Sequence, residues 1–118
     1  MNIEWPVFIF EVDGYFQRVD SQVDLHHLYE PEYWDEVCVV FDAKFQQLEL
    51  RDCCVQPRLE VVAGVDVVSF ERWARKALIR MWKVNRFRVR RANLREAYSV
   101  NNLDADELWR ELIIRSEL

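Results

Sequence analysis

The hydrophobic pattern of this sequence changes its period at residue 69. Short apolar runs within residues 5–68 follow a period of two, which is typical of β-strands. From Ser69 onward, apolar residues recur every three or four positions, the period of a helix with one buried face. The sequence therefore predicts an α+β fold, in which strands come first and helices follow. The helical stripe consists of Phe70, Trp73, Ala74, Ala77, Leu78, Met81 and Trp82.

The first half is expected to form an antiparallel sheet of about five strands within residues 5–68. Asp13-Gly14 is the strongest hairpin signal, because a type I′ turn requires a positive φ at both central residues. Pro6 cannot donate a hydrogen bond, so pairing should begin at Val7, in a strand that is apolar on both faces and lies inside the sheet. A bend or bulge is expected at Gly64. The predicted strands are residues 5–12, 15–19, 37–42, 45–50 and 59–68.

Short capping patterns mark where the helices begin. Ser21 with Asp24 forms a capping box at the start of a short helix inserted into the sheet. Ser69 is the predicted cap of the long amphipathic helix, and Asp104 with Glu107 opens the last helix. We expect the C-terminal helices to pack on one face of the sheet. The predicted helices are residues 21–29, 69–82, a short one ending near residue 101, and one from residue 104.

The length of 118 residues predicts a single domain over residues 1–118, mainly β in 1–68 and mainly α in 69–118. Three cysteines without paired spacing indicate a reducing compartment. No apolar run approaches the roughly 20 residues of a membrane span, and the N-terminus lacks the form of a signal peptide. We therefore expect a cytoplasmic protein that does not bind membranes. The sequence does not indicate its oligomeric state.

The residues that could bind a metal or carry out catalysis form no recognised motif. His26 and His27 are neighbours on a predicted helix, where their side chains point about 100° apart. Cys38, Cys53 and Cys54 lack the spacing of structural zinc ligands. Phosphate-binding loops and nucleophile motifs are also missing from the sequence. We expect a binding protein and not an enzyme, with no metal and no cofactor.

Charge is distributed unevenly along the chain. Residues 1–68 hold 14 Asp/Glu and 4 Lys/Arg, a net charge of −10, whereas residues 69–118 have a net charge of +5. Residues 72–95 contain ten bases and no acid, with Trp73, Trp82 and Phe87 among them, which suits phosphate binding and base stacking. A pI near 5.1 and the polar helix face that carries many of these bases favour a solvated surface instead. A nucleic-acid-binding or regulatory module that uses residues 72–95 is therefore the alternative function, with nucleic acid the less favoured partner.

The acidic segment of residues 20–36 has six acids and no Lys or Arg. Large aromatic side chains with a polar group stand among these acids, as they do in the central contacts of many protein–protein interfaces. We expect this segment to bind a protein partner. The candidate partner-binding residues are Asp20, Asp24, Glu30, Glu32, Tyr33, Trp34, Asp35 and Glu36.

Residues 21–50 resemble a pattern of small bacterial immunity proteins, the cytoplasmic antidotes encoded beside polymorphic or contact-delivered toxins. In that pattern a strand pair leads to a "DL…LEP" helix and then to a "YDA-Gly-Arg-x-L-x-L" hairpin. Here Lys44-Phe45 stand where the pattern has Gly-Arg. The matching motifs are Ser21-x-x-Asp24-Leu25, Leu28-Tyr29-Glu30-Pro31, Val39-Val40-Phe41-Asp42-Ala43 and Leu48-Glu49-Leu50.

The resemblance implies a stoichiometric inhibitor that forms a heterodimer with a cognate bacterial toxin. Toxin active sites that handle phosphate or NAD are usually cationic. An acidic, aromatic surface can therefore occlude such a site and associate with it quickly through electrostatic steering. The resemblance implies neither which toxin is bound nor what that toxin does.

Overall fold

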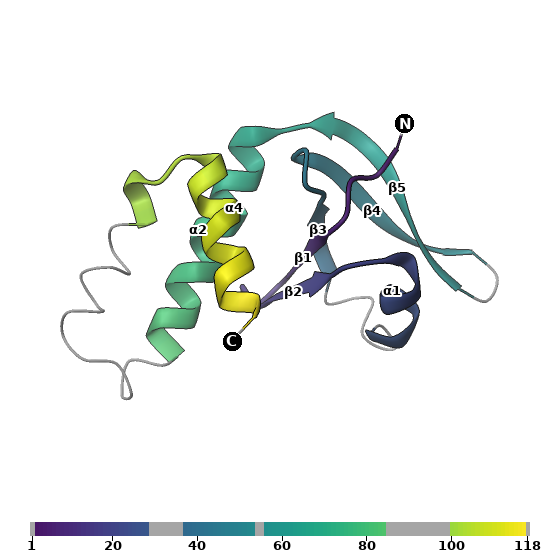
Figure 1. Cartoon of the computed structure of the whole chain (residues 1–118), viewed down its shortest axis with the longest axis horizontal. Helices are drawn as coiled ribbons and strands as arrows, with labels where there is room; N and C mark the ends of the chain where they lie inside the picture. The colour runs from purple at the N-terminus through teal and green to yellow at the C-terminus, as the bar shows by residue number, and fades with distance from the viewer. Residues whose placement is uncertain (1, 29–36, 54–55, 85–99, 118) are drawn as a thin grey trace. The chain divides into compact units, whose positions relative to one another are not determined.

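The computed structural model describes residues 2–28, 37–53, 56–84 and 100–117 (Figure 1). The chain divides into two compact units, Met1–Asp66 and Val67–Leu118. The described strands all lie in the first unit, together with one short helix, whereas the described elements of the second unit are helices. The predicted α+β fold is confirmed.

The first unit contains a five-stranded antiparallel sheet in the order β2-β1-β3-β4-β5. As predicted, the first strand begins at Val7 and lies inside the sheet, between β2 and β3. Its residues from Val7 to Phe10 are fully buried, so both faces of the strand are covered. The strands are β1 (Val7–Glu11), β2 (Phe16–Val19), β3 (Val37–Phe41), β4 (Gln46–Cys53) and β5 (Gln56–Val65).

The hairpin between β1 and β2 has a longer loop than predicted. The carbonyl of Glu11 accepts from the Gly14 N–H at 2.9 Å, and the Glu11 N–H donates to the carbonyl of Tyr15 at 2.8 Å. Gly14 has a φ of 86°, while Asp13 is not among the residues with positive φ. The predicted type I′ turn is therefore wrong. A three-residue loop needs a left-handed residue only at its last position, where glycine fits without steric cost.

The hairpin between β4 and β5 is longer at its loop end than predicted, because the ladder runs from Gln46↔Val65 to Cys53↔Gln56. The paired residues near the loop are mostly polar or charged and include Pro57, so no apolar alternation marks them as strand in the sequence. β5 also ends at Val65, before the predicted limit of residue 68. The predicted bulge is confirmed, because the register shifts near Gly64, which has a φ of 69°.

The helix α1 (Gln22–Leu28) covers one face of this sheet and contacts β2 and β5 (Figure 1). The Ser21 Oγ accepts a hydrogen bond from the Asp24 N–H at 3.2 Å, so the predicted N-terminal cap is present. Leu25 is fully buried and anchors the helix to the sheet. The apolar cluster on this face consists of Val7, Ile9, Val19, Leu25, Val40, Leu48 and Leu59.

The second unit contains α2 (Val67–Val84), the 3-10 helix η2 (Val100–Asn102) and α4 (Ala105–Ser116). The prediction that Ser69 caps α2 is wrong, because the helix already includes Val67 and Val68. β-Branched residues favour strands in isolation, so the sequence pattern places these two valines in the preceding strand. The rest of the short helix predicted before residue 101 lies outside the described residues.

Helices α2 and α4 pack against each other within the second unit. The ring centroids of Phe70 and Trp109 lie 5.9 Å apart. The Asp104–Glu107 capping box is confirmed, because each side chain bonds the backbone N–H of the other residue. Trp73 is only half-buried, with the Lys76 Nζ 4.9 Å from its ring centroid, so this ring is less central than its place in the stripe predicts. The packing of α2 on the sheet stays a prediction.

Truncating Leu25 tests the anchoring of α1. We expect Leu25→Ala to lower the free energy of unfolding by about 2–5 kcal/mol, because it removes buried methyl groups and leaves a cavity. Val23→Ala is the matched control on the same helix, since Val23 is 63% exposed. Urea denaturation followed by circular dichroism measures both effects. Equal stability of the two variants would contradict the assigned role of Leu25.

Candidate binding surface

The predicted partner-binding segment is only partly described by the structure. Asp20 and Asp24 lie in the described part, immediately before α1 and in its first turn. The structure places both acids on one short stretch of backbone that the Ser21 cap and the buried Leu25 hold to the sheet. The other predicted residues, Glu30, Glu32, Tyr33, Trp34, Asp35 and Glu36, lie outside the described residues.

The described end of the segment is accessible. The Asp20 side chain is 58% exposed and forms an ion pair with Arg18, with 2.7 Å between the Arg18 Nε and the Asp20 Oδ1. Val23 projects into solvent on the same helix, and His27 is exposed one turn further on. Sequence reasoning missed Val23 as a possible contact residue, because an isolated valine between polar neighbours carries no signal of its own.

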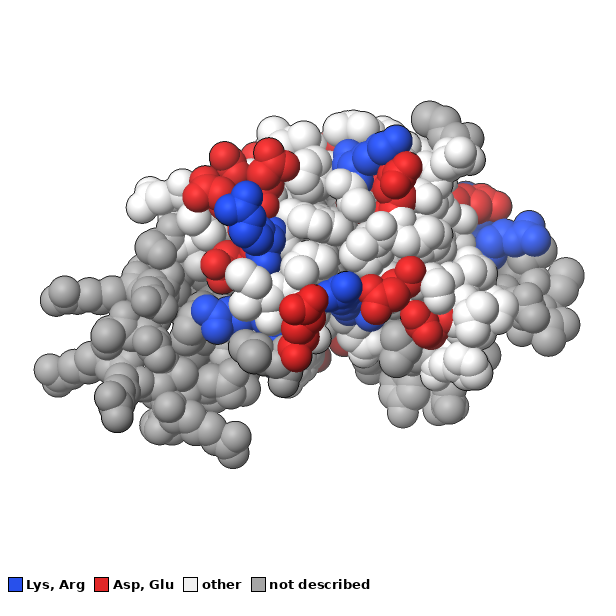
Figure 2. Space-filling view, in the orientation of Figure 1, with Lys and Arg blue, Asp and Glu red and all other residues white. Residues whose placement is uncertain are grey.

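Lys44 and Arg51, two of the bases of the first unit, pair with acids other than Asp24. Lys44 pairs with Glu4 at 3.3 Å, and Arg51 contacts Glu49 at 3.1 Å and Glu60 at 2.8 Å. On the face drawn in Figure 2, basic side chains likewise lie beside acidic ones.

Asp13 and Asp24 are among the acids of this unit that stay outside these pairs. Neither Asp13 nor Asp24 forms an ion pair with any residue that the structure describes. The start of α1 therefore keeps negative charge that the described residues around it do not neutralise.

The structure describes the side chains of both histidines of α1 and of Cys38. His26 Nε2 lies 2.9 Å from Gln22 Nε2, one turn earlier on the helix, and Cys38 is an exposed free thiol on β3. Within the described ranges, no group of three or more His, Cys, Asp or Glu side chains is arranged to hold a metal ion.

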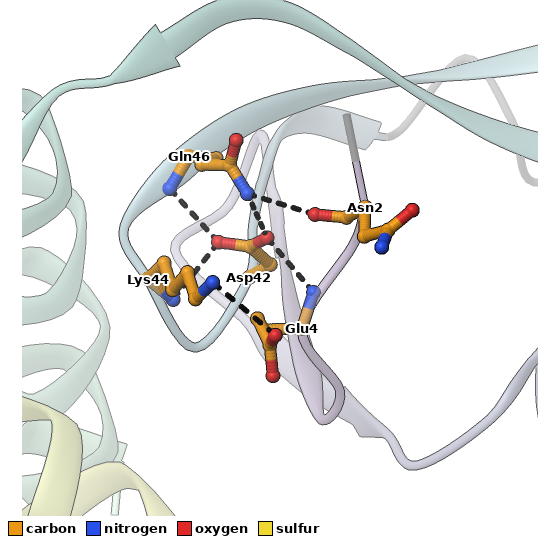
Figure 3. A network of polar contacts seen from close by, with 5 residues as sticks. All are labelled: Asn2, Glu4, Asp42, Lys44 and Gln46. Carbon is orange, nitrogen blue, oxygen red and sulfur yellow. Dashed lines mark hydrogen bonds and ion pairs between the residues drawn. The ribbon is translucent and has the colours of Figure 1, made fainter.

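A buried carboxylate in the described part of the first unit accepts several hydrogen bonds and forms a polar network (Figure 3). Asp42 is fully buried at the turn between β3 and β4. Its Oδ1 accepts from the backbone N–H groups of Lys44 at 3.0 Å and Gln46 at 2.9 Å. Its Oδ2 accepts from the Gln46 Nε2 at 2.7 Å and from the Glu4 N–H at 3.1 Å. The Gln46 Nε2 also donates to the Asn2 carbonyl at 3.2 Å, so the network ties the N-terminal segment to this hairpin.

Each oxygen of Asp42 accepts two hydrogen bonds, which is the usual capacity of a carboxylate oxygen. No lone pair is left to take a proton from a substrate or to bind a cation. Asp42 is therefore a structural residue. The sequence predicted only a turn here, since nothing in a local pattern reveals a bond to Glu4, 38 residues away.

The turn that Asp42 organises carries a strained residue. Phe45 has a φ of 61°, the left-handed region that a bulky side chain rarely adopts. Its N–H donates to the Asp42 carbonyl at 3.0 Å, and the Asp42 N–H donates to the Gln46 carbonyl at 3.2 Å. This is the arrangement of the first hairpin, with Phe45 in the place of Gly14.

The basic segment of residues 72–95 is described only in part. Arg72 and Lys76 are exposed on α2, and Arg80 is half-buried. Arg75 is engaged within its own unit, because its Nη2 donates to Glu71 at 2.9 Å and to the Leu103 carbonyl at 2.8 Å. Residues 85–95 lie outside the described residues. The described bases of α2 therefore differ in solvent exposure, and Arg75 already binds acceptors within its own unit.

The comparisons with other proteins add no family assignment. The chain matches no protein-family model, no curated protein and no solved structure. Among the helices that the structure describes, none is long and apolar enough to cross a membrane.

Substituting Asp42 tests the buried network. Asp42→Asn keeps the size of the side chain but turns an amide group toward N–H donors. We expect it to lower the free energy of unfolding by roughly 3–5 kcal/mol, because buried donors lose their acceptor. Asp13→Asn, at an exposed acid of the first hairpin, should stay within about 0.5 kcal/mol of wild type. Chemical denaturation measures both, and a neutral Asp42→Asn would contradict the role assigned to the network.

Proposed function

We propose that this protein is an immunity protein, which binds a cognate bacterial toxin in the cytoplasm and neutralises it by occluding its active site. The proposed contact is the acidic, aromatic segment of residues 20–36. The observation that carries the proposal is the excess of acid in residues 1–68, with a net charge of −10, around a segment that contains no Lys or Arg. The resemblance of residues 21–50 to immunity proteins supports the same conclusion.

The local structure suits a contact of this kind. A cap and the buried Leu25 fix the start of α1, so Asp20 and Asp24 are held on ordered backbone before any partner arrives. Preorganisation lowers the entropy cost of binding. An acid without a counter-charge among the described residues, such as Asp24, also attracts a cationic partner over several ångströms, which raises the association rate at low salt.

The partner to test is the protein encoded in the reading frame next to this gene, which the proposal expects to be the toxin. We expect the two proteins to form a one-to-one complex that abolishes toxin activity in solution. Co-purification followed by a toxin activity assay measures this. A neighbouring protein that neither binds nor loses activity would contradict the proposed function.

Charge reversal locates the contact. We expect Asp20→Lys with Asp24→Lys to slow association with the toxin at least about tenfold at low salt and to weaken its salt dependence. The matched control is Asp13→Lys with Glu49→Lys, which makes the same charge change. It likewise combines one ion-paired acid with one that has no ion pair among the described residues. Surface plasmon resonance measures the rates. Equal slowing by both doubles would show steering by overall charge, without a contact at this segment.

The aromatic part of the segment is tested separately. We expect charge reversal at Glu32, Asp35 and Glu36 to slow association, whereas Trp34→Ala should mainly speed dissociation, since a lost aromatic contact weakens the formed complex. Both variants should keep the wild-type circular dichroism spectrum. Full protection of cells by both variants against the toxin would contradict this contact.

The alternative function, a nucleic-acid-binding or regulatory module, is distinguished by its salt dependence. Binding of residues 72–95 to duplex phosphates would weaken by about 0.9 log unit per log unit of salt for each phosphate neutralised. We expect no shift of generic DNA or RNA in a gel at low salt. A shift that is lost on charge reversal at Arg86, Arg88 and Arg90 would favour the alternative.

A further inference from the structure

The strand β5 forms one edge of the sheet, with β4 on one side and no described strand on the other. It is ten residues long, which is twice the length of β1. Long edge strands offer unpaired backbone groups to another chain. The question is which chain this edge fits.

The hydrogen bonds of β4 show which backbone groups of β5 point away from β4, toward the unpaired edge. The carbonyl of Gln46 accepts from Asp42 on the β3 side, and the carbonyl of Phe45 accepts from Asp66 on the β5 side. Because the backbone groups of successive residues alternate between the two neighbouring strands, the odd-numbered residues of β4 face β5.

Arg58 and Glu60 lie opposite odd-numbered residues of β4, so their backbone groups face β4. The N–H and C=O groups of Leu59 and Val61 consequently face the open edge. Pro57 also faces the open side and lacks an N–H, as is usual for proline on an edge strand. The edge can therefore pair with another strand through Leu59 and Val61.

The charged side chains of β5 are complementary to those of a second copy of the same strand that runs antiparallel to it. Leu59 and Val61 pack toward the apolar cluster, whereas Arg58 and Glu60 are exposed on the opposite face. A two-fold axis through Leu59 pairs two antiparallel copies of β5 so that Arg58 of each copy lies opposite Glu60 of the other. These are non-hydrogen-bonded pairs, in which opposite side chains approach most closely.

Arg58 has no counter-charge among the residues that the structure describes. It lies across from Arg51 on β4, a like charge, and it forms no ion pair with any residue in the described ranges. Arg51 contacts only one oxygen of Glu60, the Oε2. The Oε1 of Glu60 is the atom that Arg58 of a second copy can bind.

We propose that β5 is a homodimerisation edge, at which a second copy of this chain adds its own β5 antiparallel about Leu59 and extends the sheet. Pairing is limited on one side by Pro57 and on the other by the bulge near Gly64. The exposed Val62 flanks the charged pairs on the same strand. This proposal is independent of the toxin.

The test measures the mass of the full chain in solution by sedimentation velocity over a range of concentrations. We expect wild type to dimerise. Arg58→Glu and Glu60→Arg should each raise the dimer dissociation constant at least about tenfold, because each places like charges opposite one another. An equimolar mixture of the two variants should dimerise again, since the all-acidic edge of one then faces the all-basic edge of the other.

Glu49→Arg is the control, because it makes the same change on the exposed face of β4, one strand away from the edge. It should leave the dimer intact. Circular dichroism melts check that every variant is folded. A wild type that stays monomeric at millimolar concentration would overturn the proposal. So would a dimer that both single variants leave unchanged, or variants that fail to associate when mixed.

Discussion

The first unit depends on the buried carboxylate of Asp42. A buried charge is costly unless it is well hydrogen-bonded, and here the chain supplies donors from three separate residues. Two of those residues, Lys44 and Gln46, belong to the hairpin itself, while Glu4 precedes β1. One side chain thus fixes both the turn and the N-terminal segment that leads into the innermost strand.

The same network makes the conformation of Phe45 possible. A non-glycine residue at positive φ costs roughly 1–3 kcal/mol and persists only where its surroundings determine it. Asp42 bonds the backbone on both sides of Phe45, and the Phe45 carbonyl accepts from the Asp66 N–H at 2.9 Å. The hairpin that carries the family-like Asp42-Ala43 motif is therefore a structural element, and the proposed binding residues lie elsewhere.

Charge gives the first unit two distinct surfaces. Near α1, Asp24 has no counter-charge among the described residues, which suits a cationic partner. Along β5, Arg58 and Glu60 alternate in sign and suit a copy of the same strand. The two surfaces can act independently, because one concerns acids near a helix start and the other the backbone and side chains of an edge strand.

The sequence by itself determined the fold class, the five strands, the inner position of β1 and both helix caps at Ser21 and Asp104, because hydrophobic period and capping patterns are local. It also identified residues 20–36 as the most acidic segment, although most of that candidate site lies outside the described residues. Only tertiary structure decided the length of the β4–β5 ladder, the start of α2 at Val67 and the loop type at Gly14. The ladder depends on strand register, the residue before α2 is bonded to the distant Phe45 carbonyl, and the loop at Gly14 depends on which residues of β1 and β2 pair. The bond from Asp42 to Glu4 is the plainest case, since no local pattern encodes a contact across 38 positions.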